Sequence, residues 1–213
     1  MTILITAGPT REAIDPVRYL TNRSSGKMGY ALAQAAQERG HRVILISGPT
    51  IIDVPDGIDF IPIESAADMQ QAVEHWISQT DIAIFAAAVA DYRPLEIANQ
   101  KLKKSGENIT LELVRTPDIL ASARTRFNFT GTLVGFAAET ENLEENALSK
   151  LERKGCDLII ANDVSRKDIG FDSSENEVTL VYPNRLVPIP KGTKTHLAHE
   201  LIQRIEELST KKK

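Results

Sequence analysis

The chain lacks several features that would decide its class at once. Its 213 residues hold a single cysteine, Cys156, which excludes a disulfide framework and any cysteine-rich zinc site. No apolar run approaches the ~20 residues of a membrane-spanning helix, and the apolar start has no basic flank to make it a signal peptide. The formal net charge is only −4, which argues against a dedicated nucleic-acid-binding protein. We therefore expect a cytoplasmic protein that binds neither membranes nor nucleic acids, with Cys156 as a small buried thiol.

Strand and helix patterns alternate along most of the chain. β-Branched apolar runs at 2–7 and 42–47 each end at a Gly-Pro pair, and the helix formers of 27–39 lie between them. Because strands joined by helices pair in parallel, this order predicts an α/β fold with a Rossmann-like, mainly parallel sheet and helices on both faces. The remaining strands are predicted at 58–63, 81–89, 109–114, 132–137 and 157–161, and the remaining helices at 66–79, 117–127, 141–154 and 195–208.

Two segments depart from this alternation. Residues 177–182 and 185–189 flank Pro183-Asn184 and predict an antiparallel hairpin that extends the sheet. Residues 93–108 are polar, rich in lysine and without periodicity, so we expect a loop there. Neither a repeat nor a linker divides the sequence, and its length suffices to bury a core without metals or disulfides. We expect one domain over residues 1–213.

The first predicted strand is followed by the most informative stretch of the sequence. In open α/β sheets ligands bind beyond the carboxyl ends of the strands, and the connection here far exceeds the usual length of about two to six residues. It leads into a helix that begins around SSGKMG, residues 24–29. Small side chains and free N–H groups at a helix N-terminus suit an anion, but a well-capped helix start explains them equally well. The candidates for phosphate binding are Ser24, Ser25, Gly26 and Gly29.

Two common nucleotide-binding motifs are missing from this region. A P-loop needs a glycine at position 21 and a serine or threonine at position 28, where this chain has Thr21 and Met28. A dinucleotide fingerprint needs an acidic residue at the end of the second strand, which reads Ile-Ser-Gly at 46–48. An ordinary NAD-dependent enzyme is therefore disfavoured.

The strand predicted at 81–89 ends in a run of alanines, and Asp91 follows it. Small side chains such as Ala87 and Ala88 let a ligand approach the backbone closely, so both are candidates for substrate binding. Asp91 suits a ribose hydroxyl or a magnesium ion. A turn-forming aspartate is the alternative reading of the same residue.

Lysines form two further groups. Lys101 opens the run KLKK, and Lys150 and Lys154 lie four residues apart on one face of a predicted helix. Taken alone, each group is typical of a solvated surface. Beside a phosphate site, a mobile lysine loop is also able to close over a triphosphate. The sequence leaves both interpretations open.

Taken in order, these motifs resemble one family. The segments ITAGPTREAIDPVRYLTNRSSGKMG, AAAVADYR, KLKK, TPDIL, GFAAET and ANDVS make the chain similar to the bacterial phosphopantothenoylcysteine synthetases. The resemblance covers nearly the whole chain. It implies a CTP-dependent ligase of coenzyme A biosynthesis that joins 4′-phosphopantothenate and L-cysteine. The reaction it implies runs through an acyl-cytidylate and releases pyrophosphate and CMP.

The resemblance also implies roles for single residues. Asn22 matches an asparagine associated with binding the acyl-cytidylate, and Lys101 matches a loop lysine that closes over this intermediate; these two are the implied catalytic residues. Mg²⁺ is implied as the ion that neutralises the triphosphate, with Asp91 as its candidate ligand. The residues that match the CTP site are Asp91, Lys101, Pro117, Asp118, Ile119, Leu120, Phe136, Lys150 and Lys154.

The resemblance implies partners as well. The family is typically a homodimer that pairs through a β extension, for which the 177–189 hairpin is our candidate; a sheet-edge hairpin is the alternative. The family's flavin-containing decarboxylase half has no counterpart in these residues. We therefore expect no flavin. We expect either a stand-alone synthetase, with the decarboxylase activity on a separate chain, or a synthetase domain excised from a fusion with the decarboxylase. Two other functions stay open, an NAD(P)-dependent reductase and a non-catalytic nucleotide-binding module.

Overall fold

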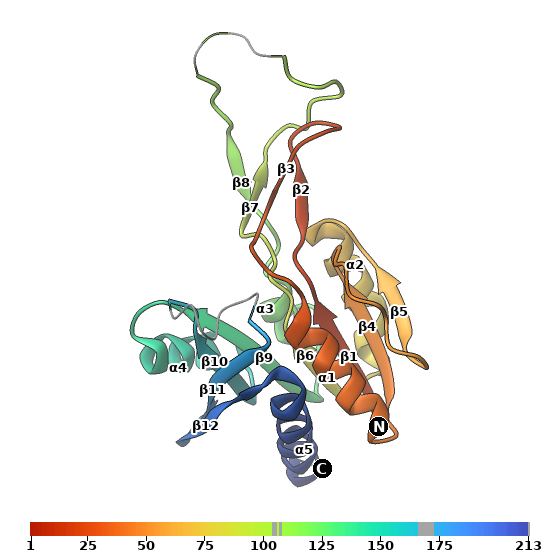
Figure 1. Ribbon diagram of the computed structural model, residues 1–213, viewed down its shortest axis with the longest axis vertical. Coiled ribbons are helices and arrows are strands. Elements are labelled where there is room, and N and C mark those ends of the chain that lie inside the picture. Colours follow the sequence, from red (N-terminus) through yellow and green to blue (C-terminus); the bar gives the residue numbers. More distant parts are fainter. Residues whose placement is uncertain (104–105, 107, 166–172, 213) are drawn as a thin grey trace.

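Eight strands form one sheet within the described residues of the computed structural model, which are 1–213 except 104–105, 107, 166–172 and 213. They are β1 (Thr2–Ala7), β4 (Arg42–Ser47), β5 (Asp59–Pro62), β6 (Ile82–Phe85), β9 (Thr132–Glu139), β10 (Leu158–Asp163), β11 (Glu175–Tyr182) and β12 (Arg185–Thr193). Their order across the sheet is β12-β11-β10-β9-β6-β1-β4-β5 (Figure 1). Neighbours from β5 to β10 are parallel, and β11 and β12 are antiparallel additions at one edge. The predicted α/β fold class is confirmed.

Helices cover both faces of this sheet. Those of the described residues are α1 (Lys27–Glu38), α2 (Ala66–Trp76), α3 (Ile119–Thr125), α4 (Leu143–Lys154) and α5 (Lys194–Lys212), and a short 3₁₀ turn, Ile77–Gln79, follows α2. Helices α1 and α5 pack on one face, where Leu32 and Leu201 are buried. Helices α2, α3 and α4 pack on the other, where Met69 and Leu151 are buried.

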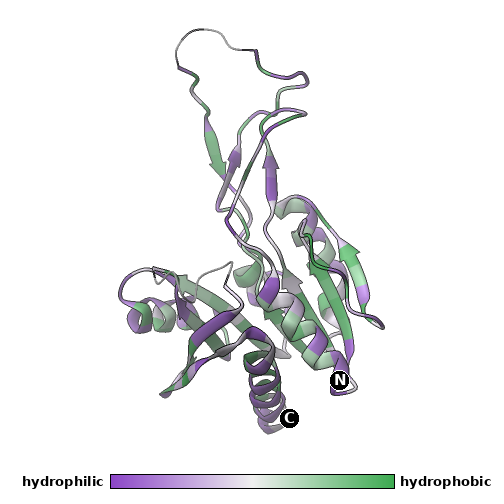
Figure 2. Cartoon of the chain, viewed as in Figure 1, coloured by the Kyte–Doolittle hydropathy of each residue, from purple (hydrophilic) through white to green (hydrophobic). Residues whose placement is uncertain are grey.

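The strands between these helices are buried on both sides. Along β1, Ile3 and Ile5 belong to the core under α1 and α5, and Leu4 belongs to the core under α2, α3 and α4. A parallel sheet sandwiched between helices has no face in water, which explains why its strands are runs of apolar residues rather than alternating ones. The parallel strands of the sheet are accordingly coloured mostly as hydrophobic in Figure 2, whereas the helices are mixed.

Helix α2 begins where its sequence predicts. The Ser65 side chain accepts a hydrogen bond from the Asp68 N–H at 3.1 Å, and the Asp68 carboxylate accepts one from the Ser65 N–H at 2.9 Å. This reciprocal pair satisfies two backbone donors that a helix start otherwise leaves free.

Two small antiparallel ribbons project from the sheet as an arm (Figure 1). One ribbon pairs β2 (Arg11–Ala13) with β3 (Tyr19–Thr21), and the other pairs β7 (Tyr92–Pro94) with β8 (Leu113–Arg115). Strands β2 and β7 contact one another. The arm is therefore residues 11–21 together with the described part of 92–115.

The arm accounts for the main errors of the sequence predictions. The strand predicted at 109–114 is wrong in position, because only its last two residues and Arg115 pair as β8. The loop predicted at 93–108 begins inside a strand, β7. Strands of three residues are too short to leave a clear alternating pattern, which is why both ribbons escaped detection. Lys104 of the KLKK run lies outside the described residues.

The bounds of α3 and β6 also differ from the predictions. Helix α3 begins at Ile119 rather than at Pro117, because Asp118 is its N-cap. Strand β6 ends at Phe85 and not at residue 89. The hairpin predicted at 177–189 is present as β11 and β12, and β11 pairs with β10 and so continues the main sheet. The hairpin thus lies at one edge of the main sheet, and its part in subunit pairing stays a prediction.

Candidate active site

A cavity of about 610 Å³ opens at the carboxyl ends of β1, β6 and β9. These ends contribute Thr6, Phe85 and Phe136 to its lining. Strand β1 lies between β4 and β6, so the chain turns to opposite sides of the sheet at this point. Such a switch point is where open α/β sheets bind their ligands.

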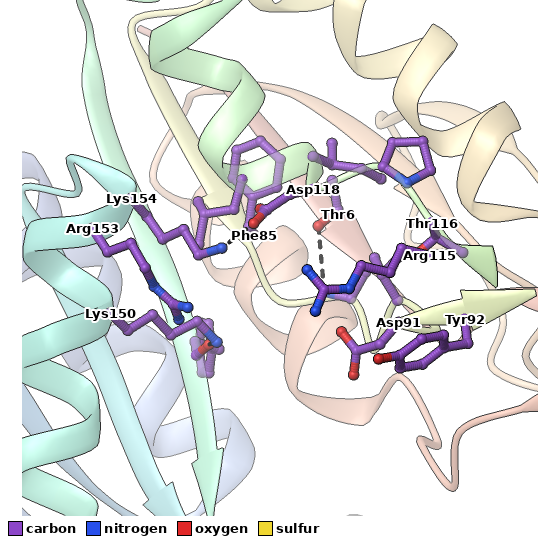
Figure 3. Close-up of a pocket in the computed structure, with 16 residues that line it drawn as sticks. Thr6, Phe85, Asp91, Tyr92, Arg115, Thr116, Asp118, Lys150, Arg153 and Lys154 are labelled. Atoms are coloured by element: carbon purple, nitrogen blue, oxygen red, sulfur yellow. Dashed lines mark hydrogen bonds and ion pairs between the residues drawn. The ribbon is translucent and has the colours of Figure 1, made fainter.

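One wall of this first cavity is basic and comes from helix α4. Lys150, Arg153 and Lys154 line it, and Figure 3 shows them side by side along the helix. The Lys150 ammonium donates to the Phe136 carbonyl at 2.7 Å. Burial lowers the pKa of Lys150, and Glu139 opposes the effect in part. The α4 wall therefore presents three cationic side chains, one of them held at the end of β9.

The opposite wall joins the arm to the start of α3. Residues 115–120 and Asp91 line it, and Figure 3 shows Arg115 and Asp91 across the cavity from α4. The Asp118 carboxylate caps α3 by accepting the Ala121 N–H at 3.0 Å, and it forms an ion pair with Lys154. Burial opposes ionisation of Asp118, but Lys154 and the Ala121 N–H outweigh it and lower its pKa.

A second cavity, of about 410 Å³, adjoins the first. Residues 22–29 and 86–89 line it together with side chains from β10, β11 and α5. Both cavities are lined by Ala87, Val89, Asp91, Phe136 and Lys150. They therefore form one continuous site in which Asp91 and Lys150 stand at the junction.

Asn22 holds the segment after β6 in place at the second cavity. Its amide nitrogen donates to the carbonyls of Ala88 and Val89 at 3.1 and 3.0 Å. The Ala88 N–H in turn donates to the Gly8 carbonyl at 2.9 Å. The alanine run after β6 is thus held against the loop after β1, with Asn22 facing the cavity.

The start of α1 supplies the glycines of this cavity. Gly26, the N-cap, has a φ of 79°, a left-handed conformation that favours glycine, and within the described residues no side chain caps the helix. The reading of 24–29 as a well-capped start is therefore not what the structure has. Gly29 lies against β1, where a Cβ would come within 2.5 Å of the Ala7 Cβ. A close helix–strand contact and the backbone N–H groups of a helix N-terminus suit an anion at this end of α1.

The structure brings together most of the residues singled out from the sequence. Lys101 is the exception. It is exposed on the arm, and it is not among the described residues that line either cavity. The first cavity takes in Asp91, Pro117, Asp118, Ile119, Leu120, Phe136, Lys150 and Lys154, and the second takes in Asn22, Ser24, Ser25, Gly26, Gly29, Ala87 and Ala88.

Sequence reasoning missed several lining residues. Arg115 and Arg153 add cations to the first cavity, and Asn176 and Lys194 are buried at the second. Arg153 stands between the two lysines already noted, and its position on α4 was the available signal. Asn176 and Lys194 come from β11 and α5, which no local pattern relates to the parallel core.

Cys156 is buried, as the sequence predicts, and it belongs to the core under α2, α3 and α4. Burial raises its pKa to about 12, so the thiol carries its proton at neutral pH. This protonation state excludes Cys156 as an activated nucleophile.

Two further features are missing from the described residues. They contain no group of three or more histidine, cysteine, aspartate or glutamate side chains arranged to hold a metal ion. Over the same part of the chain, each helix is too short or too polar to cross a membrane.

The fold and the joined cavities define a Rossmann-like α/β domain with its ligand site at the switch point of the sheet. Residues 1–208 match the family model described as DNA/pantothenate metabolism flavoprotein C-terminal domain. The chain belongs to this family.

Curated relatives carry a second half that this chain does not match. The coenzyme A biosynthesis bifunctional protein CoaBC of Vibrio vulnificus (strain YJ016) is 50% identical over 208 residues, which are 97% of this chain and 52% of that protein. The protein of the same name from Bacillus subtilis (strain 168) is 49% identical over 209 residues, 97% of this chain and 51% of that one. The chain thus spans about half the length of the curated relatives it matches.

Solved structures agree with this assignment. A crystal structure of the C-terminal domain of CoaBC has a TM-score of 0.83 at 42% identity, covering 97% of this chain and 94% of that one. The DNA/pantothenate metabolism flavoprotein from Streptococcus pneumoniae has a TM-score of 0.84 at 26% identity, with coverages of 97% and 99%. The Cab2 H337A complex with phosphopantothenate-cysteine shares the fold, with a TM-score of 0.77 at 17% identity and coverages of 98% and 87%.

Proposed function

We propose that the chain is a ligase of coenzyme A biosynthesis that joins 4′-phosphopantothenate and L-cysteine at the expense of CTP. The observation that carries this proposal is the pair of joined cavities. One has a wall of three cations from α4, and the other has Asn22 and the open start of α1. A site with two compartments suits a reaction in which a nucleoside triphosphate activates a second, phosphorylated substrate.

In the proposed first step, the carboxylate of phosphopantothenate attacks the α-phosphate of CTP. A new P–O bond forms, the bond between the α-phosphate and the β-phosphate breaks, and pyrophosphate departs. The product of this step is an acyl-cytidylate. Lys150, Arg153 and Lys154 would hold the triphosphate, with 117–120 and Phe136 around the rest of the nucleotide. The contribution of these residues is positioning and charge stabilisation rather than covalent chemistry.

In the proposed second step, the amine of cysteine attacks the acyl carbon. An amide forms, CMP leaves, and the amine loses a proton. Asn22 and the shared residue Asp91 both line the second cavity, so the Asn22 side chain and the Ala88–Val89 backbone that it holds would lie at the acyl-phosphate region of the intermediate. The start of α1, Ser24–Gly29, would take the phosphate of the pantothenate part.

Mg²⁺ would bind at this site together with the nucleotide rather than through protein ligands alone. Asp91 is a carboxylate that lines both cavities, and Asp118 is paired with Lys154. Magnesium is commonly held by one or two carboxylates together with substrate phosphates, and Asp91 would supply that carboxylate. When bound, the ion would neutralise charge on the triphosphate.

The names of the relatives support the pathway, and the Cab2 complex supports the product. The curated relatives are coenzyme A biosynthesis proteins, and the Cab2 structure holds phosphopantothenate-cysteine on the same fold. Use of CTP rests on the resemblance of the TPDIL segment and of the Lys150–Lys154 spacing to the CTP-dependent family.

We also propose that two copies of the chain pair through the arm. Exposed apolar side chains gather on it, and an isolated ribbon with such a surface is marginal in water. They are Val17, Tyr19, Tyr92, Leu95, Ile97, Ile109, Leu111 and Leu113. The 177–189 hairpin, at one edge of the main sheet, remains the other candidate for pairing.

The test is purified protein with phosphopantothenate, cysteine, Mg²⁺ and CTP, followed by chromatography of CMP and the condensed product. We expect both to form in equal amounts, and a parallel assay with ATP measures nucleotide choice. Binding of CTP without turnover would favour a nucleotide-binding module instead. Thermal stabilisation by NADPH but not by CTP would favour the reductase.

A further inference from the structure

Asp15 lies in the turn between β2 and β3, and its carboxylate is fully buried. Its side chain is 0% exposed. One oxygen accepts the N–H groups of Val17 and Arg18 at 2.8 and 2.9 Å, and the other accepts the Arg18 Nε–H at 3.0 Å. The Arg18 guanidinium and these backbone donors hold the pKa of Asp15 far below its usual range, against the effect of burial.

The same ion pair reaches across the arm to Leu102. The Leu102 N–H donates to Asp15 Oδ2 at 3.1 Å, and the Leu102 carbonyl accepts from Arg18 Nη2 at 2.9 Å. Both backbone polar groups of one residue are therefore held by one charged pair. We call this arrangement of Asp15, Arg18 and Leu102 the clasp. Lys101 directly precedes Leu102 in the chain.

The turn itself does not need the two hydrogen bonds to Leu102. Asp15 already accepts two N–H groups from within the turn, and the Ile14 N–H donates to the Arg18 carbonyl at 2.8 Å. The two bonds to Leu102 instead fix a segment 87 residues further along the chain. A second contact, from the Ala98 N–H to the Ile14 carbonyl at 3.0 Å, holds the same segment. The clasp thus anchors the start of the lysine run.

We propose that Asp15 is a positioning residue: together with Arg18 it fixes the Leu102 peptide and thereby sets the point from which Lys101 reaches the nucleotide intermediate. The proposal rests on the proposed function and on the role that the family resemblance implies for Lys101, a loop lysine that closes over that intermediate. A lysine ends in a point charge on a flexible stem, so the position of its backbone decides what the ammonium reaches. Misplacement by about 1 Å is enough to slow a reaction markedly.

A first test needs no enzymatic activity. Asp15→Asn removes the charge of the clasp, and limited trypsin digestion with mass spectrometry measures cleavage of the Lys101–Leu102 bond. We expect cleavage about tenfold faster than in the unmodified protein, since a lost charge-assisted hydrogen bond exposes this bond more often. Asp68→Asn is the matched control, because it weakens a carboxylate contact in α2 that has no link to Leu102. Equal cleavage in both variants would overturn the clasp.

A second test measures the reaction. We expect Asp15→Asn to lower kcat about tenfold, with the KM for CTP within about twofold of the unmodified protein. In a Lys101→Gln background the same substitution should add no further loss. Leu102→Pro, which lacks the donated N–H, should behave like Asp15→Asn, and Leu102→Ala should behave like the unmodified protein.

The two tests separate the possible failures. An equal kcat loss with and without Lys101, or the same loss in Asp68→Asn, would reduce Asp15 to a structural residue and overturn the proposal. Absence of CMP formation by the unmodified protein would refute the ligase function and, with it, the catalytic part of the proposal. The trypsin result would still decide whether the clasp anchors the segment.

Discussion

Lys154 and Asp118 form an ion pair that joins the two walls of the first cavity. Lys154 belongs to the last turn of α4, and Asp118 caps the start of α3. The Lys154 side chain is only 12% exposed, and Asp118 is its ion-pair partner in the free protein. A triphosphate that enters the cavity would meet a cation balanced by a single carboxylate.

Substitution of Lys154 should therefore weaken CTP binding in two ways. Lys154→Gln removes a contact to the triphosphate, and it leaves the Asp118 carboxylate facing the nucleotide without a counter-charge. We expect the KM for CTP to rise about tenfold or more, with a smaller effect on kcat. Steady-state kinetics of CMP release measures both constants.

A double substitution separates the two effects. Asp118→Asn keeps a capping side chain on α3. Added to Lys154→Gln, it should restore part of the lost affinity, because it removes the unbalanced charge. Glu152→Gln, on the exposed side of the same helix, is the control and should leave the KM unchanged. A double variant that binds CTP more weakly than the product of the two single effects predicts would contradict this account.

Lys150 should make CTP binding sensitive to alkaline pH. Its pKa in the free protein lies below the ordinary 10.5 because the side chain is buried. Below the lowered pKa the ammonium is present and pairs with phosphate; above it, binding must be accompanied by proton uptake. The affinity for CTP should therefore fall as pH rises through the lowered pKa, earlier than an exposed lysine would allow.

Lys150→Arg tests this origin of the pH dependence. Arginine keeps its charge over the whole accessible range, so the variant should bind CTP with little dependence on alkaline pH, whatever its absolute affinity. Calorimetric titration between about pH 7 and pH 10 compares the slopes. Parallel slopes for the two proteins would assign the effect to another group.

The parallel core was predictable because its signals are local. Apolar runs such as 2–7 and 42–47 mark buried strands, and the Ser65–Asp68 capping box fixes the start of α2. Each of these patterns depends on residues within about four positions of one another. The arm could not be predicted in the same way, since β7 and β8 have three residues each and pair across a long polar segment.

The site shows the same limit. Lys150 and Lys154 were recognisable because one helix turn separates them, and the alanines after β6 because they follow a strand. The clasp was not recognisable, because nothing in the local sequence relates Asp15 to Leu102. Arg115 was missed for a similar reason: it enters the cavity by way of β8, whose register the sequence did not reveal.

The arm should control the oligomeric state. Ile109 is 63% exposed on the arm, and an aspartate there would place a charge in the proposed interface. Sedimentation velocity should give the mass of a dimer for the unmodified protein and of a monomer for Ile109→Asp. Ile51, 101% exposed and outside the arm, provides a matched control, and Ile51→Asp should remain dimeric. Two variants that sediment alike would exclude the arm as the interface.

The close contact between Gly29 and Ala7 should set how near α1 packs to β1. A Cβ at Gly29 would lie 2.5 Å from the Ala7 Cβ and 3.2 Å from its Cα, so Gly29→Ala must push the helix away from the strand. We expect a loss of about 1–3 kcal/mol in the free energy of unfolding, measured by urea denaturation. Gly192→Ala is the control, because its Cβ would meet neighbours no closer than 3.6 Å, and it should change stability by less than about 0.5 kcal/mol. Similar midpoints for both variants would show that α1 seats without this close approach.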